Sequence, residues 1–193
     1  MARIAIPDDY AEAPLAYVVQ HVTPELTTPL YDLSKAVYKH SILSLREFEA
    51  VRARIAQING CQVCQKFRAI TDVPTYLEGL GEDASSAIQT RGPAPDEGFY
   101  LNVGDWRSSP LYSPREKLAL EFTEKFSETP DALGYDEEFW QRAKASFTDA
   151  EIYDLTITAA TFVATGRFVH VLGFDQTSCS LAEALPRIAE PAK

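Results

Sequence analysis

Residues 44–64 read SLREFEAVRARIAQINGCQVC and combine a complete helix pattern with two closely spaced cysteines. Ser44, followed three residues later by Glu47, is a capping-box signal for a helix start, because each side chain accepts from the other residue's free backbone N–H. Apolar residues then recur at helical spacing, at Phe48, Val51, Ile55 and Ile58. Asn59-Gly60 is a typical helix stop. The segment therefore predicts an amphipathic helix that ends directly before Cys61.

Two later segments carry the same start signal. The pairs are Ser113 with Glu116 and Thr148 with Glu151. The first predicts a helix that ends at Thr129-Pro130, and the second opens a long, nearly uncharged stretch to Leu172 that is typical of a buried central helix. The chain shows no alternating strand pattern of useful length, so we expect an all-α fold.

The chain length of 193 residues fits one domain. Segments 44–50 and 113–119 match at Ser, Arg, Glu and Ala, which suggests a duplicated helical unit. The expected organisation is a single domain over residues 1–193, with a motif-bearing half at about 25–80, a loop at about 81–112 that has room for a short helix at 84–90, and a second helical half at about 113–175.

Composition excludes several function classes. The net charge is −10 and the sequence pI is about 4.8, so the chain should repel phosphate backbones and nucleic acid is not an expected partner. No apolar run is long enough to span a membrane. The first ten residues contain no continuous apolar segment for a signal peptide, which favours a cytoplasmic location.

Cys61 and Cys64 are the clearest chemical signal. Three cysteines do not make a secreted disulfide framework, so in a reducing cytosol this pair suggests redox chemistry or metal binding. If a helix resumes after Gly60, the two residues share a face and a disulfide is geometrically plausible. A helix start favours the thiolate, and nearby Lys66 and Arg68 strengthen that preference.

Glu49 lies on the predicted helix, 12 residues before Cys61. A turn at Gly60 could fold this carboxylate back towards the thiols, where it would relay protons to or from sulfur. The alternative is an ordinary helix carboxylate that pairs with Arg52 or Arg46.

The segment from Glu49 to Cys64 resembles the Glu-x11-Cys-x2-Cys active-site segment of alkylhydroperoxidase D-like proteins, in the carboxymuconolactone decarboxylase family. Residues 105–113, DWRSSPLYS, are similar to the link before the second helical unit in peroxidase-related members. The resemblance covers roughly residues 25–175.

The resemblance implies an alkylhydroperoxidase D-like helical fold and a cofactor-free, metal-free thiol enzyme. Cys64 would attack a small hydroperoxide, Cys61 would resolve the sulfenic acid as a disulfide, and Glu49 would belong to the proton relay. A dithiol or protein would be the reductant, and subunits would form a homo-oligomer (dimer, trimer or hexamer). Helix-start physics instead favours Cys61 as the attacking residue.

Arg68 departs from the family pattern, which has His four residues after the second cysteine. Arginine does not accept a proton at ordinary pH. Arg68 would still stabilise a Cys64 thiolate from one helical turn away, and His40 or His170 would have to supply the missing acceptor. On a largely apolar segment, however, His170 is more typical of a core histidine with its own partner.

Three other functions stay open. Zinc would need two further ligands, and only Cys179, His21, His40 and His170 are available. A decarboxylase-like role on a ring-opened aromatic acid is disfavoured by the CxxC pair. A non-catalytic redox sensor or oligomeric interaction protein would keep the dithiol without efficient proton transfer.

Overall fold

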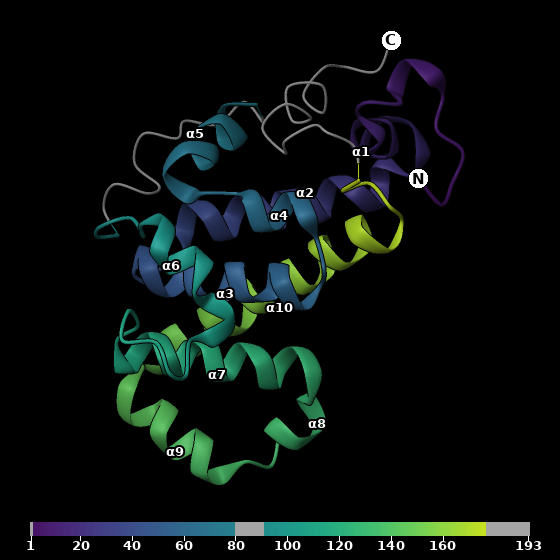
Figure 1. Cartoon of the computed structure of the whole chain (residues 1–193). Helices are drawn as coiled ribbons and strands as arrows, with labels where there is room; N and C mark the ends of the chain where they lie inside the picture. The colour runs from purple at the N-terminus through teal and green to yellow at the C-terminus, as the bar shows by residue number, and fades with distance from the viewer. Residues whose placement is uncertain (1, 80–90, 177–193) are drawn as a thin grey trace.

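A computed structural model describes residues 2–79 and 91–176. Within these residues it contains ten α-helices and no strand, which confirms the predicted all-α class (Figure 1). In chain order the elements are η1 (Asp8–Tyr10), α1 (Pro14–Tyr17), η2 (Val18–Val22), α2 (Pro24–His40), α3 (Leu45–Ile58), α4 (Gln62–Lys66), α5 (Ala69–Gly79), α6 (Glu97–Leu101), η3 (Val103–Asp105), α7 (Pro114–Glu128), α8 (Pro130–Leu133), α9 (Glu137–Ser146) and α10 (Asp149–Val171).

Helix α3 is the central element. It packs against both α7 and α10, and α10 also packs against α2 (Figure 1). Where these helices meet, Phe48 of α3 makes an edge-on contact with Phe162 of α10, and both rings contact Tyr38 of α2. Such aromatic contacts add to the stabilisation from burial. The long last helix therefore packs into the core as predicted, but it is not buried along its whole length, because Tyr153, Ala164, Arg167 and Val171 are exposed.

The three predicted capping boxes are all present. Ser44, Ser113 and Thr148 each accept from the backbone N–H three residues later, and the glutamate at that position accepts in return. In each box both free backbone donors are satisfied, which stabilises the helix start. Helices α3, α7 and α10 therefore begin where the sequence predicts.

The starts of α3 and α7 are joined by two crossed ion pairs. Arg46 Nε donates to Glu116 Oε1 at 2.6 Å, and Arg115 Nε donates to Glu47 Oε1 at 2.5 Å. Each arginine lies inside one capping box and binds the glutamate of the other, so the two matching segments make equivalent contacts. A duplicated helical unit remains a prediction, and this exchange of partners supports it.

The prediction of a loop over residues 81–112 is incomplete. Asp96 caps a short helix, α6, by accepting from the Phe99 N–H, and the 3-10 turn η3 follows. Phe99 and Tyr100 are buried against α3 and α7, so tertiary packing stabilises a helix too short for a sequence pattern. The short helix expected at 84–90 lies outside the described residues.

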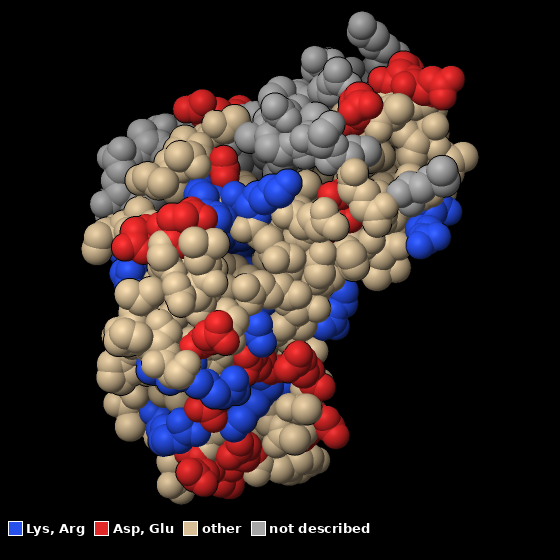
Figure 2. Space-filling model, in the orientation of Figure 1, with Lys and Arg blue, Asp and Glu red and all other residues tan. Residues whose placement is uncertain are grey.

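The core has two clusters of buried side chains. The larger joins α2, α3, α5, α7 and α10, and the smaller fills the space between α3, α6, η3 and α7. Acidic and basic side chains are intermingled over the region of α7 and α9 on the face shown in Figure 2. In the described part of the chain, no helix is long and apolar enough to cross a membrane.

Candidate active site

The turn between α3 and α4 positions the two cysteines. Gly60 has a positive φ of 72°, which ends α3, and Cys61 then caps the N-terminus of α4. Cys61 and Cys64 form a disulfide with their Cα atoms 5.3 Å apart. The Cys64 N–H also donates to Cys61 Sγ at 3.3 Å. The predicted helix restart and the predicted disulfide are both present.

The two cysteines differ in exposure. Cys61 is fully buried, whereas Cys64 is partly exposed and lines a pocket between α2, α3 and α10. A molecule that enters this pocket meets Cys64 first. This difference favours Cys64 as the attacking residue and Cys61 as the resolving one.

The pocket beside Cys64 has a cavity volume of about 60 Å³ and mostly apolar walls. A cavity of this size is space for a few water molecules or a small organic group, since one water needs roughly 10–15 Å³. The lining residues are Tyr31, Ser34, Tyr38, Arg52, Ile55, Ala56, Asn59, Cys64, Phe67, Phe162, Thr165, Gly166 and Val169.

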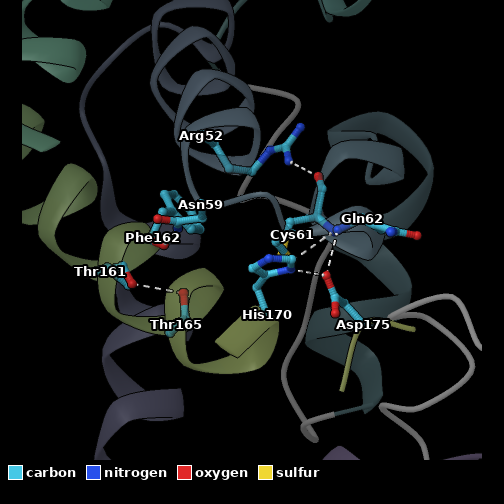
Figure 3. The surroundings of a disulfide bond; sticks show 10 residues. Arg52, Asn59, Cys61, Gln62, Thr161, Phe162, Thr165, His170 and Asp175 are labelled. Atoms are coloured by element: carbon cyan, nitrogen blue, oxygen red, sulfur yellow. Dashed lines mark hydrogen bonds and ion pairs between the residues drawn. A yellow bond between two sulfur atoms is a disulfide. The ribbon is translucent and has the colours of Figure 1, made fainter. Parts of the chain in front are cut away.

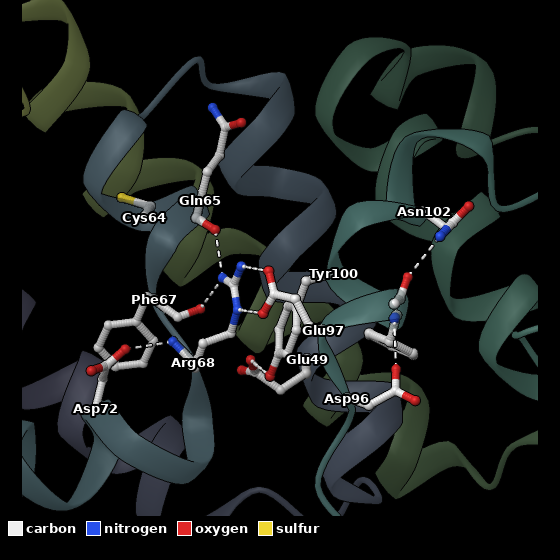
Figure 4. Close-up of polar contacts among 12 residues, drawn as sticks. Glu49, Cys64, Gln65, Phe67, Arg68, Asp72, Asp96, Glu97, Tyr100 and Asn102 are labelled. Carbon is white, nitrogen blue, oxygen red and sulfur yellow. Dashed lines mark hydrogen bonds and ion pairs between the residues drawn. The ribbon is translucent and has the colours of Figure 1, made fainter.

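Glu49 belongs to a buried network in which Arg52 separates it from the disulfide. Its two oxygens accept from Arg52 Nε at 2.8 Å and Nη2 at 2.9 Å. Tyr100 Oη donates to Oε2 at 2.7 Å (Figure 4). Arg52 also donates to the carbonyl oxygens of Cys64 and Phe67. In the described structure, the Glu49 carboxylate therefore reaches the CxxC helix through Arg52 and has no direct contact with sulfur.

Burial and charge shift two pKa values in this network. Burial of Arg52 opposes its charged form, but the Glu49 carboxylate outweighs this and raises the pKa of Arg52 above its ordinary value. Burial, reinforced by Glu49, raises the pKa of Tyr100 far above the usual range for a phenol. Arg52 therefore stays charged and Tyr100 stays a hydrogen-bond donor. The alternative Glu49–Arg52 pairing is present, but inside the protein rather than on a solvated surface.

Arg68 lies one turn after Cys64 and is turned towards α6. Its guanidinium makes a two-pronged ion pair with Glu97, donates to the carbonyls of Gln65 and Phe67, and covers the Tyr100 ring at 4.2 Å. The hydrogen bond to Glu97 raises the pKa of Arg68 despite partial burial. Figure 4 shows the Cys64 sulfur pointing away from this guanidinium. Stabilisation of a thiolate by Arg68 thus stays a prediction.

His170 lies at the disulfide, which sequence reasoning did not establish. Its Nδ1 is 2.9 Å from Asp175 Oδ2, and the same oxygen accepts from the Gln62 N–H at 2.9 Å (Figure 3). The ring also covers Gly60, where an added Cβ would lie 3.0 Å from Nε2. Rather than sitting in the core, the side chain is 38% exposed. The sequence feature that could have indicated this contact is Gly173, a helix stop after which the chain folds Asp175 back onto the last turn of α10.

The other candidate residues are not part of this site. His40 is exposed at the end of α2, and His21 contacts Tyr10. Cys179 lies outside the described residues. Among the described residues, no three His, Cys, Asp or Glu side chains lie close enough to hold a metal ion.

Comparison with known proteins gives one partial relative. The chain is 34% identical over 106 residues to the uncharacterized protein YnjA of Escherichia coli (strain K12). The alignment covers 55% of this chain and 47% of that protein, so the chain spans about half the length of this relative. No protein-family model matches the chain.

Proposed function

We propose that this protein is a dithiol oxidoreductase that reduces hydroperoxides with Cys64 as the attacking residue and Cys61 as the resolving residue. The observation that carries the proposal is the asymmetric disulfide, with one buried cysteine and one cysteine at an apolar pocket. The resemblance to alkylhydroperoxidase D-like proteins supplies the reaction class.

The chemistry balances with two thiols and one hydroperoxide. The Cys64 thiolate attacks the terminal peroxide oxygen, the O–O bond breaks, and the alkoxide takes a proton and leaves as an alcohol. The Cys61 thiol then attacks the Cys64 sulfenic acid, which forms the disulfide and releases water. An external dithiol or a reduced protein thiol pair returns the enzyme to its starting state.

The pocket favours an organic hydroperoxide over hydrogen peroxide. Apolar walls between α2, α3 and α10 stabilise a hydrocarbon substituent through the hydrophobic effect, whereas hydrogen peroxide has no such group. The hydrocarbon end of a small organic hydroperoxide would occupy this space, with its peroxide end towards Cys64.

Counting thiols in a single turnover tests the proposal. A Cys179→Ser background leaves only two cysteines. The reduced protein would be mixed anaerobically with equimolar cumene hydroperoxide. We expect fast loss of both thiols and release of one equivalent of alcohol.

Two matched variants assign the sulfurs. Cys64→Ser should keep its remaining thiol, whereas Cys61→Ser should accumulate a sulfenic acid that dimedone traps. Undiminished peroxide reduction by Cys64→Ser would refute the proposal. Two persistent thiols in the parent protein would also refute it and favour the decarboxylase-like alternative.

A further inference from the structure

Asp175 orients the His170 ring and sets its tautomer. The Asp175 side chain is fully buried, and its Oδ2 faces both the His170 ring and the backbone of Gln62. An ionised carboxylate only accepts hydrogen bonds, so Nδ1 must carry the proton in this contact. The neutral ring then has its free lone pair on Nε2.

The free nitrogen lies beside the chain that carries Cys61. Nε2 would be 3.0 Å from a Cβ on Gly60, the residue directly before Cys61. Asp175 holds the N–H of Gln62, the residue directly after Cys61. The pair therefore contacts the residues on both sides of Cys61. His170 lies against Gly60, and Asp175 accepts from the N–H of Gln62 (Figure 3).

Cys61 needs a proton acceptor whenever the disulfide closes. In the disulfide form Cys61 is fully buried, so its sulfur has no direct contact with solvent. Glu49 is engaged with Arg52 and Tyr100, and Arg68 has no acceptor nitrogen at ordinary pH. The His170 ring is 38% exposed and connects this buried position to solvent.

We propose that His170 is the proton acceptor for Cys61 and that Asp175 is its positioning residue. This inference rests on the proposed redox cycle of the dithiol. During closure, Nε2 takes the Cys61 proton as Cys61 Sγ attacks Cys64 Sγ. The proton then goes to the departing hydroxide, which leaves as water. When an external thiol opens the disulfide, Nε2 takes the proton of that thiol and delivers it to the Cys61 thiolate that leaves.

Among the described residues, few charged side chains lie near this ring. Asp175 contacts it from the turn after α10, and the link between α3 and α4 presents backbone and the cysteines. Arg167, one turn earlier on α10, is directed to Asn59 and the Ser127 carbonyl. The Asp175 carboxylate therefore orients the ring and determines which nitrogen faces Gly60.

The decisive experiment separates the two chemical steps. Reduced protein in the Cys179→Ser background would be mixed with excess cumene hydroperoxide in a stopped-flow instrument. Sulfenic acid formation on Cys64 depends on peroxide concentration, whereas disulfide closure does not. The variant His170→Asn keeps a donor to Asp175 but removes the base, and exposed His40→Asn is the matched control.

We expect His170→Asn to slow closure on the order of a hundredfold at neutral pH, with sulfenic acid formation changed less than about twofold. Closure should recover as pH rises, because hydroxide replaces the base. Asp175→Asn should slow closure too, and added imidazole should restore closure in His170→Ala. Unchanged closure in His170→Asn, or an equal fall in both steps at every pH, would overturn the inference.

A second experiment uses no peroxide and therefore tests the role of His170 independently of the peroxidase proposal. Cys64 attacks dithiobis(nitrobenzoate), which releases a first coloured thiolate and leaves a mixed disulfide on Cys64. Cys61 then attacks the Cys64 sulfur, which closes the protein disulfide and releases a second coloured thiolate, and the rate of this second release is measured. If peroxide does not react but His170→Asn slows this release, the peroxidase proposal fails and the role of His170 stands. Equal release in both proteins refutes that role.

Discussion

At the residue scale, the buried Glu49–Arg52 ion pair should be sensitive to substitution. Arg52 is 3% exposed, and Glu49 supplies its compensating charge. Glu49→Gln should lower the free energy of unfolding by about 3–5 kcal/mol, because it leaves a buried charge unpaired. Tyr100→Phe removes one hydrogen bond to the carboxylate and should cost about 1.5–3 kcal/mol.

Urea unfolding measures both effects, and Tyr135→Phe is the control because Tyr135 is 88% exposed. That control should stay within about 0.5 kcal/mol of the parent protein. A Glu49→Gln protein as stable as the parent would mean that Arg52 finds another partner.

Gly60 is constrained by its backbone and by the ring above it. Its φ of 72° disfavours any side chain, and a Cβ would press against His170. Gly60→Ala should therefore cost about 1–2 kcal/mol for the backbone alone and should slow disulfide closure by displacing the ring. Gly134→Ala is the matched control, with an ordinary φ of −59° and no contact for its Cβ below 3.6 Å.

Thermal unfolding measures the loss of stability in Gly60→Ala, and thiol kinetics measure its rate of disulfide closure. Gly134→Ala should leave stability unchanged or raise it by about 0.4–1 kcal/mol. A Gly60→Ala protein with normal closure would show that the ring position is unimportant for the thiols.

At the element scale, the crossed pairs between α3 and α7 should be energetically coupled. Glu116 is 5% exposed, so loss of Arg46 leaves its carboxylate poorly compensated. A double-mutant cycle with Arg46→Ala and Glu116→Ala should give a coupling energy of about 1–3 kcal/mol. The Arg142–Glu121 pair is more exposed and should couple by less than about 1 kcal/mol. Equal coupling in both pairs would contradict this assignment.

One face of helix α10 lines the pocket. Two threonines of this helix, one on that face and one away from it, therefore serve as a test position and its control. Thr165 lines the pocket and Thr156 does not, although each is half-buried and donates to the carbonyl four residues earlier. Thr165→Leu narrows the pocket and should lower kcat/KM for cumene hydroperoxide about tenfold, with little change for hydrogen peroxide. Thr156→Leu should leave both values unchanged. An equal fall for both peroxides in Thr165→Leu would argue against binding of the organic group there.

How far the sequence predicts an element depends on how local its cause is. The starts of α3, α7 and α10 follow from capping boxes within four residues, so they were predictable. Helix α6 has five residues and depends on burial of Phe99 and Tyr100. The same limit applies to the site: Cys61, Cys64 and Glu49 follow from spacing, whereas the contact of His170 with Gly60 depends on how α10 packs against the end of α3.

At the scale of the whole molecule, large apolar side chains remain on the surface. Leu26, Leu101 and Val171 are 74%, 72% and 64% exposed. They lie on three different helices, α2, α6 and α10, and a contiguous apolar patch rather than single exposed residues would indicate a contact between copies of the chain. Homo-oligomerisation thus stays a prediction, and the reductant of the disulfide stays one as well.

The stability of the whole fold should fall in alkaline solution through two buried tyrosines. Burial, reinforced by Glu49, raises the pKa of Tyr100 far above normal. Burial outweighs Arg46 and raises the pKa of Tyr112 to about 12. Both phenols ionise near pH 10 in an unfolded chain, so above this pH the folded state holds more protons than the unfolded state. The free energy of unfolding must then decrease as pH rises.

Urea unfolding at about pH 9 and about pH 11 should show a loss of roughly 3 kcal/mol from these two groups. The Tyr112 contribution should stop growing above its folded pKa of about 12, while that of Tyr100 continues. Tyr100→Phe and Tyr112→Phe should each flatten the pH dependence, whereas the exposed Tyr153→Phe should not. If all three variants kept the parent slope, other groups would control alkaline stability. The buried cluster between α3, α6 and α7, which contains Tyr100 and Tyr112, would then contribute nothing to the pH dependence of stability.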